Sequence, residues 1–364
     1  MPDLPSEVLI DILLRLPTKS IGQFKSVCKY WFSLISSADF VKLHHHQAII
    51  DTNKNHSRVF IAYAHLLHSV NFASSACYEG YNVDDDTNAV VTLNDPFEKE
   101  SVDGKLMGSC YGLIYHVCYD DCILLWNPTT QEMRLIPDKS TSFSDGTRFY
   151  GLGYDLINDE YKMVRACHSI SSKSISSEVF DLKSDSWRTV QVSHMDINSP
   201  DEIGILSNGA VHWLVRHSDD SDKHDTILSF DMKDEIFIET ALPNVPNVTT
   251  IELIGFTSLG DLKGFLYAVY GGCEGVDADV WVMKEYGAVD SWSKIIRLTW
   301  AEFGCDYGIS PVCFIHEDDV VVDIDAWDIY RYNVSEKTMK RFNKFTTDWH
   351  ISLLYTEALV SPYG

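Results

Sequence analysis

Long apolar runs are missing from this sequence of 364 residues. No stretch approaches the roughly 18 consecutive apolar residues that indicate a membrane-spanning helix. The chain also opens without the basic segment followed by an apolar segment that marks a secretory leader. We therefore expect neither membrane insertion nor secretion, and we expect the protein in the cytosol, the nucleus or both.

Residue patterns typical of metal sites are also poorly represented. The nine cysteines include no Cys-x-x-Cys pair. Cys118 and Cys122 form a looser pair with His116 close by, but the second pair of ligands that a structural zinc site needs is missing. We expect free, mostly buried thiols in a reducing compartment, and no metal.

Catalytic motifs are absent as well. The sequence has no phosphate-binding P-loop and no G-x-S-x-G elbow, and Gly151 and Gly153 lack the third glycine of a dinucleotide-binding loop. Acidic runs at residues 84–86 and 219–222 lack the spacing of a calcium loop. We therefore expect a protein that is not an enzyme and that carries no cofactor.

Basic residues are few, and the deficit is uneven. The chain has 29 Lys and Arg against 53 Asp and Glu, yet residues 1–50 contain five basic and four acidic residues. The remainder therefore carries 24 basic and 49 acidic residues, a net charge of −25. Such a field repels nucleic-acid phosphates and anionic lipids and attracts a basic protein partner, although the acidity could also serve solubility alone.

Residues 4–43 are predicted to form short helices with more apolar surface than they can bury among themselves. The first helix begins near Pro5 and ends before Pro17, and its apolar residues recur at spacings of three and four: Leu4, Val8, Leu9, Ile12, Leu13 and Leu16. Thr18 is the expected N-cap of a second helix, whose apolar residues are Ile21, Phe24, Val27, Trp31, Leu34 and Ile35. So short a segment buries too little surface to be stable alone, so it is predicted to dock on a partner, or else on the rest of the chain.

Three histidines, His44, His45 and His46, end this helical head. A helix C-terminus tolerates partly charged imidazoles, so we expect them to be solvated there rather than to bind a metal. The polar stretch 47–57 that follows is expected to be a linker. Beyond it the apolar period changes to two, which predicts an all-β body.

The body repeats. Five units across residues 104–345 each contain an apolar strand, a turn that carries Asn or Asp in four of the five, and a return strand. Their aromatic anchors are separated by 54, 50, 51 and 51 positions: Trp126, Phe180, Phe230, Trp281 and Tyr332. A unit of about 50 residues with four strands has the size of a propeller blade.

The strands outside these five units are expected to complete a sixth blade, formed from both ends of the chain, that closes the ring and leaves no open edge. A β-sandwich with long insertions would explain the strands but not the period. Two acidic clusters, 317–319 and 323–328, flank one apolar strand of the fifth unit. We expect their carboxylates to emerge together at one end of a blade.

The helical head resembles the F-box of plant F-box proteins. The likeness rests on the order Leu-Pro, Val-Leu-x-x-Ile-Leu, Arg-Leu-Pro, Lys-Ser, Val-Cys-Lys-x-Trp and Leu-Ile within residues 4–35. In that family the helices dock on a Skp-type adaptor, which joins them to a cullin and RING ubiquitin ligase. The resemblance implies that the adaptor face, or the small core behind it, consists of Leu4, Pro5, Val8, Leu9, Ile12, Leu13, Leu16, Pro17, Ile21, Phe24, Val27, Cys28, Trp31 and Leu34. Gly22 departs from the family, which usually has Leu or Val there, and a glycine inside a helix costs about 1 kcal/mol relative to alanine.

The body is similar to the F-box-associated domain of the same proteins, including the S-locus F-box proteins. GSCYGLI (108–114), WNPTTQEMRLIP (126–137) and GLGYDLINDEYKMVR (151–165) carry the resemblance. It implies a mainly β chain, with an α-helical F-box at 1–46, a linker at 47–57 and a kelch-like, six-bladed β-propeller at 58–361.

The function implied is that of a substrate receptor in a Skp–cullin–F-box ubiquitin ligase, in which the head binds the adaptor and the propeller holds a target. Exposed aromatic and acidic loop residues are the candidates for target binding: Tyr81, Asp84, Asp85, Asp219, Asp220, Trp300, Trp327, Asp328 and Trp349. The likeness to S-locus proteins would imply a basic secreted ribonuclease as target, and the acidic body agrees with a basic target. The alternatives are an adaptor-bound scaffold that does not degrade its partner, and a propeller enzyme or glycan reader.

Overall fold

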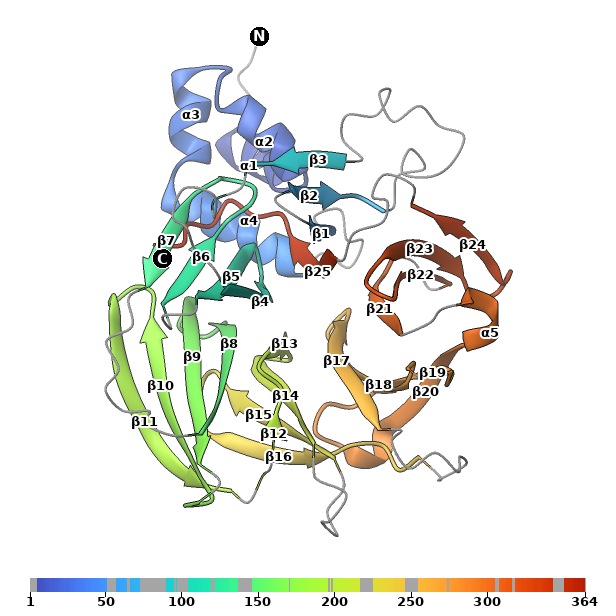
Figure 1. Ribbon diagram of the computed structural model, residues 1–364. Helices are drawn as coiled ribbons and strands as arrows, with labels where there is room; N and C mark the ends of the chain where they lie inside the picture. Colours follow the sequence, from blue (N-terminus) through green and yellow to red (C-terminus); the bar gives the residue numbers. More distant parts are fainter. Residues whose placement is uncertain are drawn as a thin grey trace.

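The computed structural model consists of a helical head and a ring of six β-sheets (Figure 1). It describes residues 5–50, 57–63, 66–72, 90–94, 96, 104–118, 122–136, 146–169, 171–195, 197, 199–216, 225–245, 255–273, 275–304, 308–315, 318–342 and 350–363. This arrangement confirms the expected fold class, an α-helical N-terminus followed by a six-bladed propeller.

The head contains four helices: α1 (Ser6–Leu14), α2 (Thr18–Phe24), α3 (Lys29–Ile35) and α4 (Ala38–Ile50). Pro5 and Pro17 stand directly before α1 and α2, where a proline's missing N–H costs nothing and its fixed φ suits the helix start. The single second helix that was expected is two helices. Cys28 separates them in an extended conformation, and its Sγ caps α3 by accepting a hydrogen bond from the Trp31 amide at 3.5 Å.

Two further expectations for the head are wrong. Thr18 is the first residue of α2, not its cap, and its hydroxyl donates instead to the carbonyl oxygen of Glu357 at 3.2 Å. Residues 47–50 belong to α4 rather than to a linker. The helix continues because Ala48 is buried and Ile49 packs against the core of the first two blades, so a helical backbone buries apolar surface that a linker would expose.

The first three blades follow in chain order. Blade 1 contains β4 (Gly104–Cys110), β5 (Leu113–Cys118), β6 (Ile123–Trp126) and β7 (Met133–Ile136). Blade 2 contains β8 (Thr147–Asp155), β9 (Glu160–Ser169), β10 (Ser174–Asp181) and β11 (Ser186–His194). Blade 3 contains β14 (Ala210–Arg216), β15 (Thr226–Asp231) and β16 (Phe237–Ala241), and its inner strand is split into β12 (Ser199–Pro200) and β13 (Ile205–Ser207).

The remaining blades complete the circle. Blade 4 contains β17 (Phe256–Leu262), β18 (Phe265–Gly271), β19 (Ala278–Met283) and β20 (Trp292–Leu298), with a 3₁₀ turn, η3 (Val289–Ser291), before the last strand. After the short helix α5 (Trp300–Phe303), blade 5 contains β21 (Ile309–Phe314), β22 (Asp319–Ile324), β23 (Asp328–Asn333) and β24 (Thr338–Arg341). Blade 6 contains β25 (His350–Thr356), β1 (Ser57–Tyr63), β2 (Leu66–Val70) and β3 (Val90–Leu93).

Blade 6 closes the ring as the sequence predicted. Its inner strand, β25, comes from the C-terminal end of the chain and pairs antiparallel with β1, from Ser57 opposite Thr356 to Tyr63 opposite His350. The two ends of the domain are thereby joined by backbone hydrogen bonds. Opening the ring requires breaking this whole ladder, which couples the last strand to the stability of the first.

The repeated aromatic residues mark one structural position. Each lies on the third strand of its blade, counted from the ring axis, and points into the sheet packing, so the period of about 50 residues is the period of the blades. The polar residue after the aromatic bonds its own turn in three blades: Asn127, Asp231 and Asn333 accept hydrogen bonds from backbone amides two or three residues later. Asp181 differs, because its carboxylate binds Arg188 instead.

The expected acidic group of blade 5 does not form. Asp319 begins β22, whereas Asp323 and Asp328 lie near its other end and at the start of β23, so the two clusters are separated by the length of a strand. Asp319 accepts from Arg331 at 2.5 Å, and Asp323 accepts from the Ser352 hydroxyl at 2.6 Å. These carboxylates join neighbouring strands and do not form one surface.

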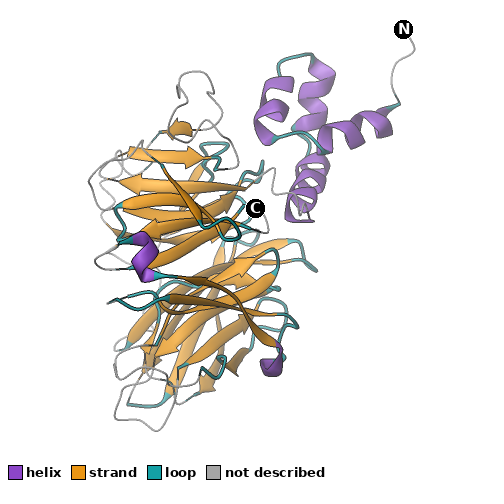
Figure 2. Ribbon diagram, turned by 90° about the vertical axis from the view of Figure 1, so that its right-hand side faces the viewer, coloured by secondary structure: helices purple, strands orange, loops and turns teal. Residues whose placement is uncertain are grey.

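The blades present two distinct faces. Because neighbouring strands are antiparallel, the turns between first and second strands lie on one face, which we call the head face, and the turns between second and third strands lie on the far face. The head lies beside the β4–β5 and β8–β9 turns, which belong to the head face. Figure 2 shows the helices projecting from this side of the ring.

Candidate functional site

The head has a small core of its own. Leu13, Ile21, Ile35 and Phe40, which we call the head core, are buried together. Phe24 and Trp31 form an edge-to-face pair beside it, with ring centroids 5.3 Å apart. The apolar periodicity of the sequence is therefore divided between this core and a second, exposed set.

The exposed apolar residues form the surface that the head offers to a partner. On α1, Val8 and Ile12 are one helical turn apart and are 44% and 45% exposed; Val27, before α3, is 60% exposed. Three more of the predicted adaptor residues are exposed: Pro5, Pro17 and Cys28. Five are half-buried, namely Leu9, Leu16, Phe24, Trp31 and Leu34, and two, Leu13 and Ile21, belong to the head core. Leu4 lies outside the described residues. Large apolar side chains gathered on one small unit are typical of a binding surface.

Sequence reasoning missed two members of this surface. Tyr30 and Phe32, on α3, are more than half exposed. They flank the half-buried Trp31. When residues 18–35 were expected to form one continuous helix, Trp31 was the only one of these three aromatic residues assigned to its apolar stripe. A helix restarting at Cys28 turns both neighbours outward, and the extended Cys28 that causes this restart has no clear signal in the sequence.

The joint between head and propeller is made by α4. His45 is buried among three tyrosine rings of blades 1 and 2, Tyr111, Tyr154 and Tyr161, with ring centroids 5.0 to 6.2 Å away. Its Nε2 lies 3.3 Å from the Tyr161 hydroxyl. His44 is buried too, so the expectation of solvated imidazoles is wrong for these two histidines. Their burial follows from the packing of α4 on the ring.

An acidic residue on the ring completes the joint. Asp159, in the β8–β9 turn, pairs with Lys42 of α4, accepts a hydrogen bond from the Tyr154 hydroxyl, and lies 3.3 Å from Nε2 of His46. Burial raises the pKa of Asp159, but the hydrogen bonds from Lys42 and Tyr154 and the charge of Lys42 lower it more, so the net shift is downward. The Asp159 carboxylate therefore stays ionised and binds the ammonium group of Lys42.

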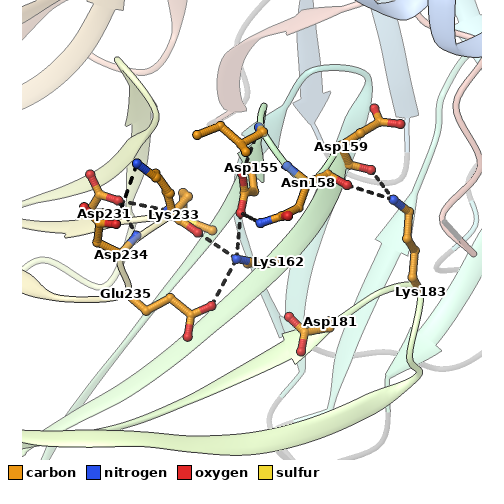
Figure 3. Close-up of polar contacts among 12 residues, drawn as sticks. Asp155, Asn158, Asp159, Lys162, Asp181, Lys183, Asp231, Lys233, Asp234 and Glu235 are labelled. Carbon is orange, nitrogen blue, oxygen red and sulfur yellow. Dashed lines mark hydrogen bonds and ion pairs between the residues drawn. The ribbon is translucent and has the colours of Figure 1, made fainter.

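The β8–β9 turn is held firmly from the propeller side (Figure 3). Asp155 accepts hydrogen bonds from the amides of Ile157 and Asn158, and Lys162 donates to Asp155 at 2.9 Å. The same Lys162 reaches blade 3, where it binds Glu235 at 3.0 Å. A turn fixed in this way is a rigid platform for α4.

Lowering the pH from 7.5 to 5 should weaken this joint. Burial and, to a lesser extent, the neighbouring His46 and His44 lower the pKa of His45 to about 3, although the charge of Asp159 acts in the opposite direction. A histidine with a depressed pKa in the folded state binds a proton more readily when unfolded, so its contribution is present above its ordinary pKa of 6.5 and is lost as the pH falls below it. At pH 5 the expected loss is about 2 kcal/mol.

Urea unfolding of the wild type and of His45→Gln at the two pH values measures this effect. The glutamine cannot be protonated, so the stability difference between the two proteins should shrink by about that amount at pH 5. A difference independent of pH would contradict a neutral, buried His45. The charged and titratable groups around it are Lys42, His44, His46, Tyr111, Tyr154, Asp159 and Tyr161.

A cavity of about 490 Å³ lies between inner strands of the blades. Its lining combines hydroxyl and apolar side chains, and its charged members are Asp201 and Asp261. Asp201 pairs with Arg216, and Asp261 accepts from the Ser207 hydroxyl at 2.7 Å. Both carboxylates therefore take part in contacts within the propeller.

Three of the predicted target-binding residues lie within the described residues. Trp327 is 50% exposed in the β22–β23 turn on the far face. Next to it, Asp328 binds Arg341 at 2.9 Å. Trp300 is half-buried and packs against the core of blades 4 and 5, which gives it a structural role. Tyr81, Asp84, Asp85, Asp219, Asp220 and Trp349 lie outside the described residues.

Comparison with known families decides what the two parts are. Residues 1–43 match the F-box domain, and residues 58–362 match the F-box associated beta propeller domain, which alone covers well over half of the chain. The chain is an F-box protein with an F-box-associated β-propeller. Its resemblance to that family is confirmed.

Relatives of this F-box protein share most of its length. It is 34% identical over 303 residues to the Arabidopsis thaliana F-box/kelch-repeat protein At3g23880, a match that covers 81% of this chain and 79% of the relative. It is 26% identical over 321 residues to the F-box protein CPR1 of the same plant, covering 82% and 73%. Both alignments reach well beyond the F-box, so the propeller is part of the likeness.

The F-box retains its structure in spite of Gly22. A Cβ added at this position of α2 would meet nothing within 4 Å, so no tight packing requires a glycine. Its cost is therefore the helix propensity alone, on a short helix whose remaining contacts are in place.

In the part of the chain that the structure describes, no helix is both long and apolar enough to span a membrane. Among the same residues, no three His, Cys, Asp or Glu side chains are grouped so that they could hold a metal ion.

Proposed function

We propose that this F-box protein is the substrate-recognition subunit of a Skp–cullin–F-box ubiquitin ligase. The observation that carries the proposal is the exposed apolar surface of the F-box, around Val8 and Ile12 on α1 and Tyr30 and Phe32 on α3, which lies outside the head core. F-box proteins in general are non-catalytic adaptors. The chain thus contributes binding, and it raises the rate of ubiquitin transfer by bringing the target close to the conjugating enzyme.

The propeller is proposed to bind the target through its far face, away from the F-box. Trp327 supports this choice, because an exposed tryptophan in a turn has the large, rigid surface that dominates protein interfaces. The net charge of −25 beyond residue 50 favours a basic target, whose capture should weaken as the ionic strength rises. We place this function in the cytosol and nucleus, where the ligase partners act.

Affinity capture from plant cells with the proteasome blocked tests the proposal. The wild type should recover a Skp-type adaptor and a target protein, and Trp327→Ser should recover the adaptor but lose the target. Phe265→Ser, at a 45% exposed aromatic residue beginning β18 beside a head-face turn, is the matched control and should recover both. Failure of the wild type to bind any Skp-type adaptor would refute the proposal, and a target whose half-life ignores proteasome inhibition would favour a scaffold.

A further inference from the structure

The C-terminal segment, residues 357–363, follows β25 and is bound along blade 1. The side chain of Asn127 is fully buried, and its Nδ2 donates to the carbonyl oxygens of Ala358 at 3.0 Å and Val360 at 2.7 Å. Ala358 and Val360 are themselves buried in the core shared by blades 1 and 2. The segment is therefore a structural part of the propeller although it pairs with none of the strands that the structure describes.

Blade 1 holds this segment as far as its last described residue. Nη1 of Arg134 donates to the Pro362 carbonyl oxygen at 3.2 Å, and the Tyr363 hydroxyl donates to the Met133 carbonyl oxygen at 3.0 Å. The guanidinium carbon of Arg134 also lies 5.4 Å from the centre of the Tyr363 ring. These contacts stabilise the segment on the blade independently of the F-box.

The other side of the segment contacts the F-box. The buried Thr18 hydroxyl, at the start of α2, donates to the Glu357 carbonyl oxygen at 3.2 Å. Leu359 packs against the head core, whereas its neighbours Ala358 and Val360 pack against the blades. Alternate side chains thus point to different domains, as the geometry of an extended chain requires.

This contact is separate from the joint made by α4. There, Lys42 and His45 meet the β8–β9 turn and the tyrosines of blades 1 and 2, whereas the C-terminal segment meets α2 and the head core. A single contact along α4 would leave the F-box free to roll about that helix. A second contact at a different helix removes this rotation, so together they fix one orientation.

We infer that residues 357–363 are a positioning element of the ligase: by binding blade 1 and the F-box at once, they set the direction in which the propeller presents its target to the conjugating enzyme. The inference rests on the proposed function. Buried Glu357, whose carboxylate pairs with Arg58 of β1 at 2.9 Å, fixes the start of the segment to blade 6. Transfer by proximity depends on orientation, so loss of this contact should lower the transfer rate without weakening either binding step.

The test removes the contacts between the C-terminal segment and the F-box and keeps those between the segment and blade 1. Thr18→Val with Leu359→Ala removes the hydroxyl and the apolar contact but leaves every contact with blade 1 intact. Unnatural amino acids that carry a pair of distance probes replace the exposed residues Gln23, in the F-box, and Lys263, in the propeller. The probes report the distribution of distances between the two domains. We expect a narrow distance distribution in the wild type and a broad one in the variant. Ubiquitination at saturating target should then fall at least fivefold and spread over more lysines, with adaptor and target affinities unchanged within twofold.

Two controls keep this test decisive. Tyr363→Ala, which affects only the blade 1 end of the segment, should keep the narrow distribution and the full rate. If the double variant is unstable, the single change Thr18→Val replaces it in the test. This milder change should broaden the distance distribution to a smaller extent. A narrow distribution in the double variant, or a broad one with unchanged transfer, would overturn the inference. Absence of adaptor binding by the wild type would instead refute the proposed function, so the two failures are distinguishable.

Discussion

Replacing Ile12 by lysine should weaken binding of the Skp-type adaptor at least 100-fold, which corresponds to about 3 kcal/mol. Ile12 and Val8 form an apolar strip on α1 that is nearly half exposed in the free protein and points away from the head core. Burying such side chains at an interface supplies much of its free energy, and a charge in their place must be desolvated without a partner. Titration calorimetry with purified adaptor measures the loss.

The substitution is chosen so that folding is preserved. Position 12 is near the C-terminus of α1, where a cation interacts favourably with the helix dipole, and the head core does not include it. Ile238→Lys is the matched control, because Ile238, on β16 of the propeller, is 46% exposed and Ile12 is 45% exposed. It should bind the adaptor normally. If Ile12→Lys retained wild-type affinity, the α1 strip would not be the adaptor face.

The ring could be predicted from the sequence because its information is repeated. Five aromatic residues recur at nearly constant spacing, and each occupies the third strand of a blade, where the packing is the same. The closure of the ring could also be predicted, because strand patterns occur at both ends of the repeated region and an unpaired strand edge is unfavourable. The division of the head's apolar residues into core and surface needed the structure, since a stripe on α1 contains both Ile12 and the buried Leu13.

The joint could not be predicted, because polar residues make it. Three consecutive histidines at a helix end indicate exposure to solvent, yet His45 is buried among tyrosines that lie more than sixty residues later in the chain. Thr18 looked like a cap, and its actual acceptor, Glu357, lies 339 residues later. Sequence patterns describe local geometry, whereas these contacts depend on where the ring places Tyr154, Tyr161 and the C-terminal segment.

Replacing Lys162 by methionine should destabilise the propeller by about 3 kcal/mol. The Lys162 side chain is buried, and its Nζ binds Asp155 at 2.9 Å, Glu235 at 3.0 Å and the Met232 carbonyl oxygen at 2.7 Å (Figure 3). Methionine keeps the volume but leaves the buried Asp155 carboxylate without a cation. Glu235 loses less, because Arg188 still binds it. Urea unfolding at pH 7.5 measures the change, and Lys183→Met, at an exposed lysine of the same region, should cost less than about 0.5 kcal/mol.

The pH dependence identifies Asp155 as the cause. Burial raises the pKa of Asp155, but hydrogen bonds from Asn158, Lys162 and the turn amides outweigh it and lower the pKa to about 2. A carboxylate with a depressed pKa stabilises the fold above its ordinary pKa of 3.8, and this stabilisation is lost as the pH falls towards 2. The cost of Lys162→Met should therefore be full at neutral pH and shrink in acid. Asp155→Asn in the same chain should restore part of the stability, because the buried charge is gone; if the double variant were as unstable as the sum of the two single changes, Lys162 and Asp155 would not act as a pair.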